Sequence, residues 1–161
     1  MHLYLLRHGD ALETGYTDTE RPLSPLGEQQ AAMVAQRLQS QHIVLELILS
    51  SPLVRAKQMT DIIRKALNIT EQQTTEHLLP ASSERKLINL LNDIEKQTLL
   101  LVGHEPQLRE FISFLTGRPQ YQRIELKKAS LAYIYTPTPI EPCSGILKWI
   151  LPYDQMKTSM K

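Results

Sequence analysis

Four short motifs combine histidines and arginines in a fixed order along the chain, and these residue types suit the chemistry of phosphoryl groups. The guanidinium group of arginine presents a planar fork of donors that matches phosphate oxygens. A neutral imidazole can attack phosphorus and so divide hydrolysis into two easier steps. We therefore expect one pocket that binds a phosphoryl group and holds a histidine able to attack it. The motifs are Arg7-His8-Gly9, Arg21-Pro22-Leu23, Ser51-Pro52-Leu53-Val54-Arg55-Ala56 and Gly103-His104.

The side chains of this set have expected roles. His8 is the candidate nucleophile, and the nearby cations should lower its pKa and keep its ring neutral at pH 7. His104 would stabilise the negative charge that develops on the phosphoryl oxygens. Arg7 and Arg55 complete the expected catalytic set, and both are expected to bind phosphate together with His104.

Arg21 lies in the long first loop and is expected to bind phosphate as well. An alternative is that it only holds this loop in a salt bridge. Arg55 has a similar alternative, because it could cap a helix or pair with Glu28.

The hydrophobic pattern predicts the elements that must position these motifs. Short apolar runs at residues 3–6, 45–49 and 99–102 are typical of strands covered on both faces, as in a parallel sheet. Two of these runs end directly at a histidine motif. Ser24 as cap and Pro25 as first helical residue mark the start of the first helix. Helical stripes of apolar residues lie between and after the strands, at residues 31–38, 56–67, 87–94 and 108–115.

Strands that alternate with helices predict a three-layer α/β/α fold with a mostly parallel central sheet. Residues 131–135 and 146–151 read as two further strands, and the proline-rich segment between them predicts an antiparallel hairpin at the sheet edge near the C-terminus. In such sheets, ligands bind beyond the carboxyl ends of the strands, where both histidine motifs are expected. The length of 161 residues, without a linker segment, predicts a single domain over residues 1–161.

The composition favours a cytoplasmic protein without a nucleic-acid or membrane partner. The 18 basic and 17 acidic residues give a net charge of +1, so the surface as a whole does not attract nucleic acid. We expect no signal peptide, and no apolar segment approaches the roughly 18 residues of a membrane span. Cys143 is the only cysteine, which excludes an internal disulfide and suits a reducing compartment.

Other catalytic centres do not fit the spacing. A cysteine phosphatase needs C-x5-R, and counting on from Cys143 reaches Trp149. The zinc motif H-E-x-x-H needs a second histidine where Leu108 stands. Zinc held by His8 and His104 would lack a third ligand and would be repelled by the arginines. We therefore expect no metal and no cofactor.

Taken together, the motifs resemble those of the histidine phosphatase superfamily and, within it, the SixA phosphohistidine phosphatase family. The resemblance covers nearly the whole chain and implies a phosphoglycerate mutase-like fold with a phosphorylated His8. It also implies a phosphate pocket formed by Arg7, Arg55 and His104, with assistance from Arg21. The residues that carry it are Leu6-Arg7-His8-Gly9-Asp10-Ala11, Arg21-Pro22-Leu23-Ser24 with Gly27, Ser51-Pro52 with Arg55-Ala56 and Gln58, and Val102-Gly103-His104-Glu105-Pro106.

Two features depart from the family pattern. Met59 stands where the family commonly has threonine, and we expect it to change packing rather than chemistry. No carboxylate between Arg55 and His104 lies in a recognisable motif for a proton donor. Glu105 is the first candidate for that role, because another branch of the superfamily places its acid directly after the second histidine. Asp18, in the first loop, is the second candidate.

The short stretch of chain between Arg55 and His104 suggests a substrate. It leaves little chain for the helical lid that encloses small substrates in larger relatives, so we expect a minimal version of the fold without a lid insertion. An open pocket suits a side chain that projects from a protein better than a small metabolite. The expected function is therefore a cofactor-independent phosphohistidine phosphatase that acts on a histidine phosphotransfer protein in two-component signalling. Inorganic phosphate or sulfate is also expected to fit the site.

Two other functions stay open. One is a phosphatase or mutase that acts on a small phosphometabolite, which a panel of substrates would separate from the first. The other is a non-catalytic module that binds phosphoproteins, which would show phosphate-dependent binding without hydrolysis. The presence of both histidines and their arginines argues against the second.

Overall fold

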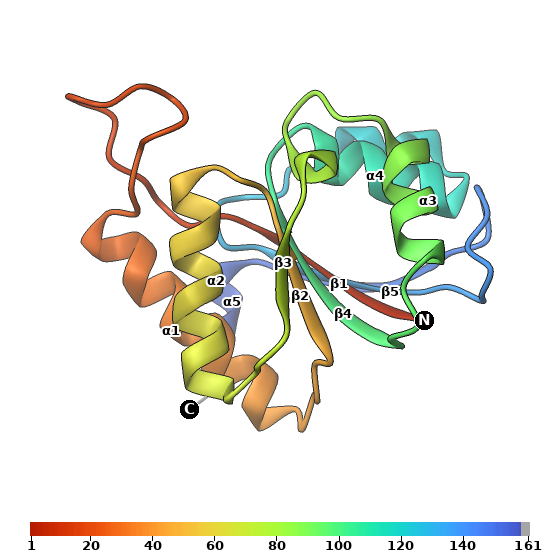
Figure 1. Cartoon of the computed structure of the whole chain (residues 1–161), viewed down its shortest axis with the longest axis horizontal. Coiled ribbons are helices and arrows are strands. Elements are labelled where there is room, and N and C mark those ends of the chain that lie inside the picture. The colour runs from red at the N-terminus through yellow and green to blue at the C-terminus, as the bar shows by residue number, and fades with distance from the viewer. Residues whose placement is uncertain (159–161) are drawn as a thin grey trace.

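The computed structural model describes residues 1–158 and shows a six-stranded sheet with helices on both faces (Figure 1). The last three residues of the predicted 1–161 domain lie outside the described residues. The strand order in the sheet is β3-β2-β4-β1-β5-β6. The strands are β1 His2–Arg7, β2 Leu47–Ser50, β3 Gln72–Thr74, β4 Thr98–Gly103, β5 Leu131–Tyr135 and β6 Ile146–Leu151.

The direction of the strands confirms the predicted sheet. Strands β1 to β4 pair in parallel, whereas β5 pairs antiparallel with β1 and β6 pairs antiparallel with β5. Because β4 lies directly beside β1, with Arg7 opposite Gly103, the two histidine motifs leave the sheet at neighbouring points. Strand β3 was not predicted, because its three residues are polar and exposed and carry no apolar signal.

The helices begin and end close to the predicted positions. The Ser24 side chain caps α1 by accepting the N–H of Gly27, and Pro25 is the first helical residue. Helix α4 ends at Gly117, which adopts φ 64°. The helices are α1 Pro25–Ser40, α2 Val54–Leu67, α3 Glu84–Asn92, α4 Gln107–Thr116 and α5 Tyr153–Thr158, with short 3₁₀ helices η1 Glu76–Leu78 and η2 Pro119–Arg123.

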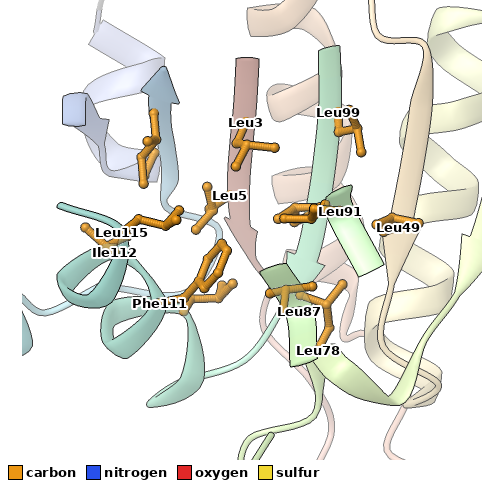
Figure 2. Packing of buried hydrophobic residues seen from close by; sticks show 14 of the residues in the cluster. Leu3, Leu5, Leu49, Leu78, Leu87, Leu91, Leu99, Phe111, Ile112 and Leu115 are labelled. Atoms are coloured by element: carbon orange, nitrogen blue, oxygen red, sulfur yellow. The ribbon is translucent and has the colours of Figure 1, made fainter. Parts of the chain in front are cut away.

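The side chains of alternating strand residues pack into two apolar clusters, one on each face of the sheet. Leu3 and Leu5 of β1 pack under α3 and α4, as Figure 2 shows, together with Phe111. Tyr4 and Leu6 of the same strand point to the other face, which α1, α2 and α5 cover. Figure 1 shows these two groups of helices on opposite sides of the sheet. The strands are thus held from both faces, and the loops at their carboxyl ends are left to form a site.

The described part of the chain contains no helix that is both long and apolar enough to cross a membrane.

Candidate active site

His8 follows β1 directly, and its backbone is fixed on both sides. Its N–H donates to the Gly103 carbonyl at 3.1 Å, and its carbonyl accepts the N–H of Ala129 at 3.2 Å. The ring Nδ1 lies 2.7 Å from the Gly9 carbonyl oxygen, which can only accept, so Nδ1 carries the proton. Arg55 Nε donates to the ring Nε2 at 3.3 Å. The ring therefore presents the Nε2 lone pair beside a guanidinium group.

Burial is the main reason why the His8 ring is neutral. Burial first, and then the positive charges of Arg55, Arg7 and Lys128, lower the pKa of His8 to about 4, against the opposing hydrogen bond to Gly9. At pH 7 the imidazole is thus uncharged and nucleophilic.

His104 follows β4 in the same way and faces His8. The two ring centroids are 4.9 Å apart, with an angle of 50° between the planes. Its Nε2 lies 2.5 Å from Ser51 Oγ, whereas its Nδ1 is buried without a partner. Burial, followed by the proximity of His8, Arg55 and Arg7, lowers the pKa of His104 to about 2. The ring is therefore neutral at pH 7.

Arg7 and Arg55 place positive charge around the two rings. Arg7 Nη1 donates to the Leu126 carbonyl at 2.6 Å, and its Nε is buried without a partner. Arg55 is 4% exposed and lies in the first turn of α2. Buried polar atoms without partners are uncommon in folded proteins. Arg7 Nε and His104 Nδ1 are two such atoms in one site.

Arg21 reaches this site only indirectly. Figure 1 shows the loop between β1 and α1 extending away from the body of the protein. Within it, Arg21 forms ion pairs with Glu13 at 3.2 Å and Asp18 at 3.4 Å. Asp18 in turn accepts from Arg55 Nη1 through its carbonyl at 2.5 Å and from Nη2 through its carboxylate at 3.4 Å. These ion pairs hold the loop together, and phosphate binding by Arg21 stays a prediction. Arg55 pairs with Asp18 instead of Glu28.

Glu105, the other candidate acid, stands directly after His104 and is half-buried. Its Oε1 is buried without a partner, and its Oε2 lies 3.4 Å from Arg109 Nε. Burial raises the pKa of Glu105, although Arg109 and Arg7 act in the opposite direction. Such a carboxyl holds its proton to a higher pH than an exposed one does.

Two residues beside His8 make contacts that the sequence did not predict. Asp10 accepts hydrogen bonds from Ser24 Oγ at 2.6 Å and from Lys128 Nζ at 2.7 Å. Lys128 is far away in sequence and gives no local signal. Met59 packs in the core as expected, but its Sδ also accepts the Gly9 N–H at 3.1 Å.

A cavity of about 360 Å³ adjoins the site, lined in part by Arg7, Lys127 and Lys128. A larger one of about 450 Å³ lies at the opposite edge of the sheet, between the C-terminal ends of α1 and α2, and shares no residue with the site. Among residues 1–158, no three His, Cys, Asp or Glu side chains gather in a way that could hold a metal ion.

Sequence comparisons relate the chain to known phosphatases. The family model for the histidine phosphatase superfamily (branch 1) matches residues 3–79. An uncharacterized protein of Picosynechococcus sp. is 35% identical over 136 residues, which cover 81% of this chain and 82% of that protein. Phosphohistidine phosphatase SixA of Escherichia coli is 26% identical over 110 residues, covering 66% of this chain and 68% of SixA. The mitochondrial serine/threonine-protein phosphatase Pgam5 of Drosophila ananassae is 33% identical over 83% of this chain, which spans only 57% of its length.

Comparison with solved structures confirms the architecture. The structure of the protein histidine phosphatase SixA complexed with tungstate matches with a TM-score of 0.87 over the full length of both chains, at 21% identity. The three-layer, phosphoglycerate mutase-like fold that the sequence predicted is therefore correct.

Proposed function

We propose, because the chain belongs to the histidine phosphatase superfamily, that this phosphatase removes phosphate from phosphohistidine side chains of a protein. The observation that carries the proposal is the state of His8: its Nδ1 donates to Gly9, and its unprotonated Nε2 accepts from Arg55 Nε. A nucleophile beside a cationic anchor suits attack on a phosphoryl group. The resemblance to SixA supports phosphohistidine as the substrate.

Hydrolysis then follows in two balanced steps. In the first, His8 Nε2 forms a bond to phosphorus while the bond from phosphorus to the leaving nitrogen breaks, and that nitrogen takes up a proton. In the second, water attacks phosphorylated His8 and returns a proton to the group that protonated the leaving nitrogen, which releases inorganic phosphate and restores the lone pair on Nε2. Arg7, Arg55 and His104 would hold the phosphoryl oxygens in both steps. No cofactor is needed, because the chain supplies both the nucleophile and the countercharges.

We assign the leaving-group proton to Glu105. Its uncommitted, buried Oε1 and its raised pKa suit a general acid. Asp18 is less suited, because its carboxylate is exposed and already engaged by Arg21 and Arg55.

A protein substrate fits the surroundings of the site. Between α2 and β4 the described chain contains only β3, η1 and α3, so no long insertion covers the histidines. A histidine phosphotransfer protein, two-component signalling and a cytoplasmic location are parts of the same proposal. The tungstate bound by SixA supports the expectation that phosphate or sulfate would occupy this site.

A parallel substrate panel tests the proposal. A phosphorylated histidine phosphotransfer domain, acetyl phosphate, a sugar phosphate, a phosphotyrosine peptide and a phosphoserine peptide would be compared by kcat/KM. The phosphohistidine protein is expected to be the best substrate. Preference for the sugar phosphate would favour a metabolite enzyme, and preference for phosphoserine would favour the activity named for Pgam5. Stoichiometric binding without turnover would indicate a binding module.

The nucleophile can be identified separately. Enzyme mixed with a substrate labelled in its phosphoryl group would be quenched in alkaline denaturant, because the bond between phosphorus and imidazole nitrogen is labile in acid. Label is expected on His8, and the His8→Ala variant should neither retain label nor turn over. Label on another residue would contradict the mechanism.

A further inference from the structure

A buried glutamine of α1 holds the peptide group on which the orientation of His8 depends. Gln30 is 6% exposed, and its Oε1 accepts the N–H of Asp10 at 2.7 Å. That N–H belongs to the peptide between Gly9 and Asp10, whose carbonyl oxygen accepts Nδ1–H of His8 at 2.7 Å. A single planar peptide therefore connects α1 to the nucleophilic ring.

The two hydrogen bonds of this peptide depend on each other. Because the peptide is planar, its N–H and C=O turn together. A bond accepted from the N–H polarises the group and makes the Gly9 oxygen a stronger acceptor for the imidazole. Without Gln30, the Asp10 N–H would be left unpaired, which favours rotation of the peptide towards another partner. Rotation would take the Gly9 oxygen away from Nδ1.

The neighbouring peptide is held from the other side. Met59 of α2, which is fully buried, accepts the Gly9 N–H through its sulfur at 3.1 Å. A Cβ on Gly9 would lie 3.0 Å from both Gln30 Oε1 and the Gly27 carbonyl oxygen, so a larger residue would require α1 to move by a few tenths of an ångström. Sulfur is a weak acceptor, so the stronger of the two restraints comes from Gln30.

We propose that Gln30 is a positioning residue that fixes the tautomer of His8. By holding the peptide after Gly9, it keeps the ring proton on Nδ1 and leaves the Nε2 lone pair for phosphorus. The identity of His8 as nucleophile rests on the proposed function, whereas the hold of Gln30 on the ring does not.

The tautomer can be read without any substrate. Protein labelled with ¹⁵N in its histidine rings would be compared by NMR at neutral pH, with His8→Ala used to assign the His8 signals. The wild type should show a protonated Nδ1 and an unprotonated Nε2. Gln30→Leu should shift these signals towards a mixture of the two tautomers. Gln30→Glu, which keeps an acceptor oxygen, should restore the wild-type pattern.

A kinetic measurement complements the spectra. With phosphoramidate as a small substrate containing a bond between phosphorus and nitrogen, Gln30→Leu should lower kcat about 10- to 100-fold, the usual cost of losing a group that orients a functional histidine. KM should change little, because the arginines that hold phosphate are untouched. Gln29→Leu is the matched control, since Gln29 is the adjacent residue of α1 but is exposed.

A folded Gln30→Leu protein that keeps the Nδ1–H tautomer and wild-type kcat would overturn the inference. If the leucine variant does not fold, Gln30→Met, which keeps the length of the side chain, takes its place with the same two outcomes. If Gln30→Leu shifts the His8 tautomer but the wild-type protein has no phosphatase activity, only the proposed function is rejected. If Gln30→Leu leaves the tautomer unchanged and the wild-type protein is an active phosphatase, only the role of Gln30 is rejected.

Discussion

The two histidines of the site are neutral chiefly because they are buried, and the surrounding cations reinforce this state. A second positive charge within 4.9 Å of the first would be strongly unfavourable among Arg7 and Arg55. A phosphate dianion bound beside His104 would reverse the balance, since its negative charge favours the protonated ring. The same residue would then rest as a neutral ring and act as a charged donor while phosphate is bound.

Arg55 is expected to stabilise the transition state more than the ground state. Arg55→Ala should lower kcat on the order of 10²–10³-fold, by analogy with the loss of other donors that stabilise developing charge. Steady-state kinetics with phosphoramidate would measure this loss of kcat. Arg64→Ala, in the same helix but paired with Asp61 away from the histidines, is the control and should keep full activity. Equal effects of the two substitutions would contradict the role of Arg55.

The effect of replacing Glu105 should depend on the leaving group of the substrate. Glu105→Gln removes the proton but keeps the shape, so it should slow phosphoserine hydrolysis about 10²-fold or more, because an alkoxide must be protonated as it leaves. Phosphoramidate should be affected much less. The ratio of the two kcat/KM values is the measurement. If Asp18→Asn changes this ratio and Glu105→Gln does not, the proton comes from Asp18.

At the scale of elements, the site depends on the close contact between α1 and the segment after β1. A Cβ on Gly27 would lie 2.1 Å from the backbone oxygen of Asp10. The same contact surface carries the bonds from Ser24 to Asp10 and from Gln30 to the Asp10 N–H. The helix and the nucleophile segment are thus fitted to each other through backbone atoms as well as side chains.

Gly27→Ala tests this fit. In an ordinary helix the change from glycine to alanine would stabilise by up to about 1 kcal/mol. Here the clash with Asp10 should reverse the sign and lower the free energy of unfolding by about 1–3 kcal/mol. Urea denaturation would measure this change in the free energy of unfolding. Glu28→Ala, at the next and exposed position, is the control. A stabilised Gly27→Ala protein would show that the contact is loose.

Elements with a strong local signal could be predicted from the sequence. The first helix was found from its apolar stripe, from Ser24 and from Pro25, and the strands leading to both histidines from their apolar runs. Strand β3 could not be found, because its pairing with β2 depends on the neighbouring backbone and not on its own side chains. The bonds that fix Asp10 also escaped prediction, since Lys128 reaches it across the folded chain.

For the whole molecule, the order of the four motifs was enough to predict that His8, His104, Arg7 and Arg55 meet at one edge of the sheet. The parallel pairing of β1 and β4 brings the two histidines together. The sequence did not reveal that Arg21 is held by Glu13 and Asp18, because loop geometry carries no periodic pattern.

The buried histidines should make the stability of the whole protein sensitive to acid. An unfolded histidine titrates near pH 6.5, whereas the folded pKa values are lowered to about 4 for His8 and about 2 for His104. The unfolded state therefore binds more protons below about pH 6.5, and stability present above that pH is lost as the pH falls towards 4. With two such groups the slope reaches at most about 2.7 kcal/mol per pH unit.

Urea unfolding at about pH 7.5 and about pH 5 would measure this loss. His104→Gln should reduce the difference between the two pH values. His42→Asn, at an exposed position whose φ of 53° asparagine tolerates, should leave the difference unchanged. A wild-type protein of equal stability at both pH values would show that the histidines are not protected from protonation.

The contact between Arg55 and Asp18 has a consequence for turnover. The guanidinium group proposed to bind phosphate already donates to oxygen atoms of Asp18. A phosphate that binds Arg55 would have to displace these oxygens, and after the reaction the Asp18 carboxylate would compete with the product for the same donors. We therefore expect the first loop to weaken product inhibition.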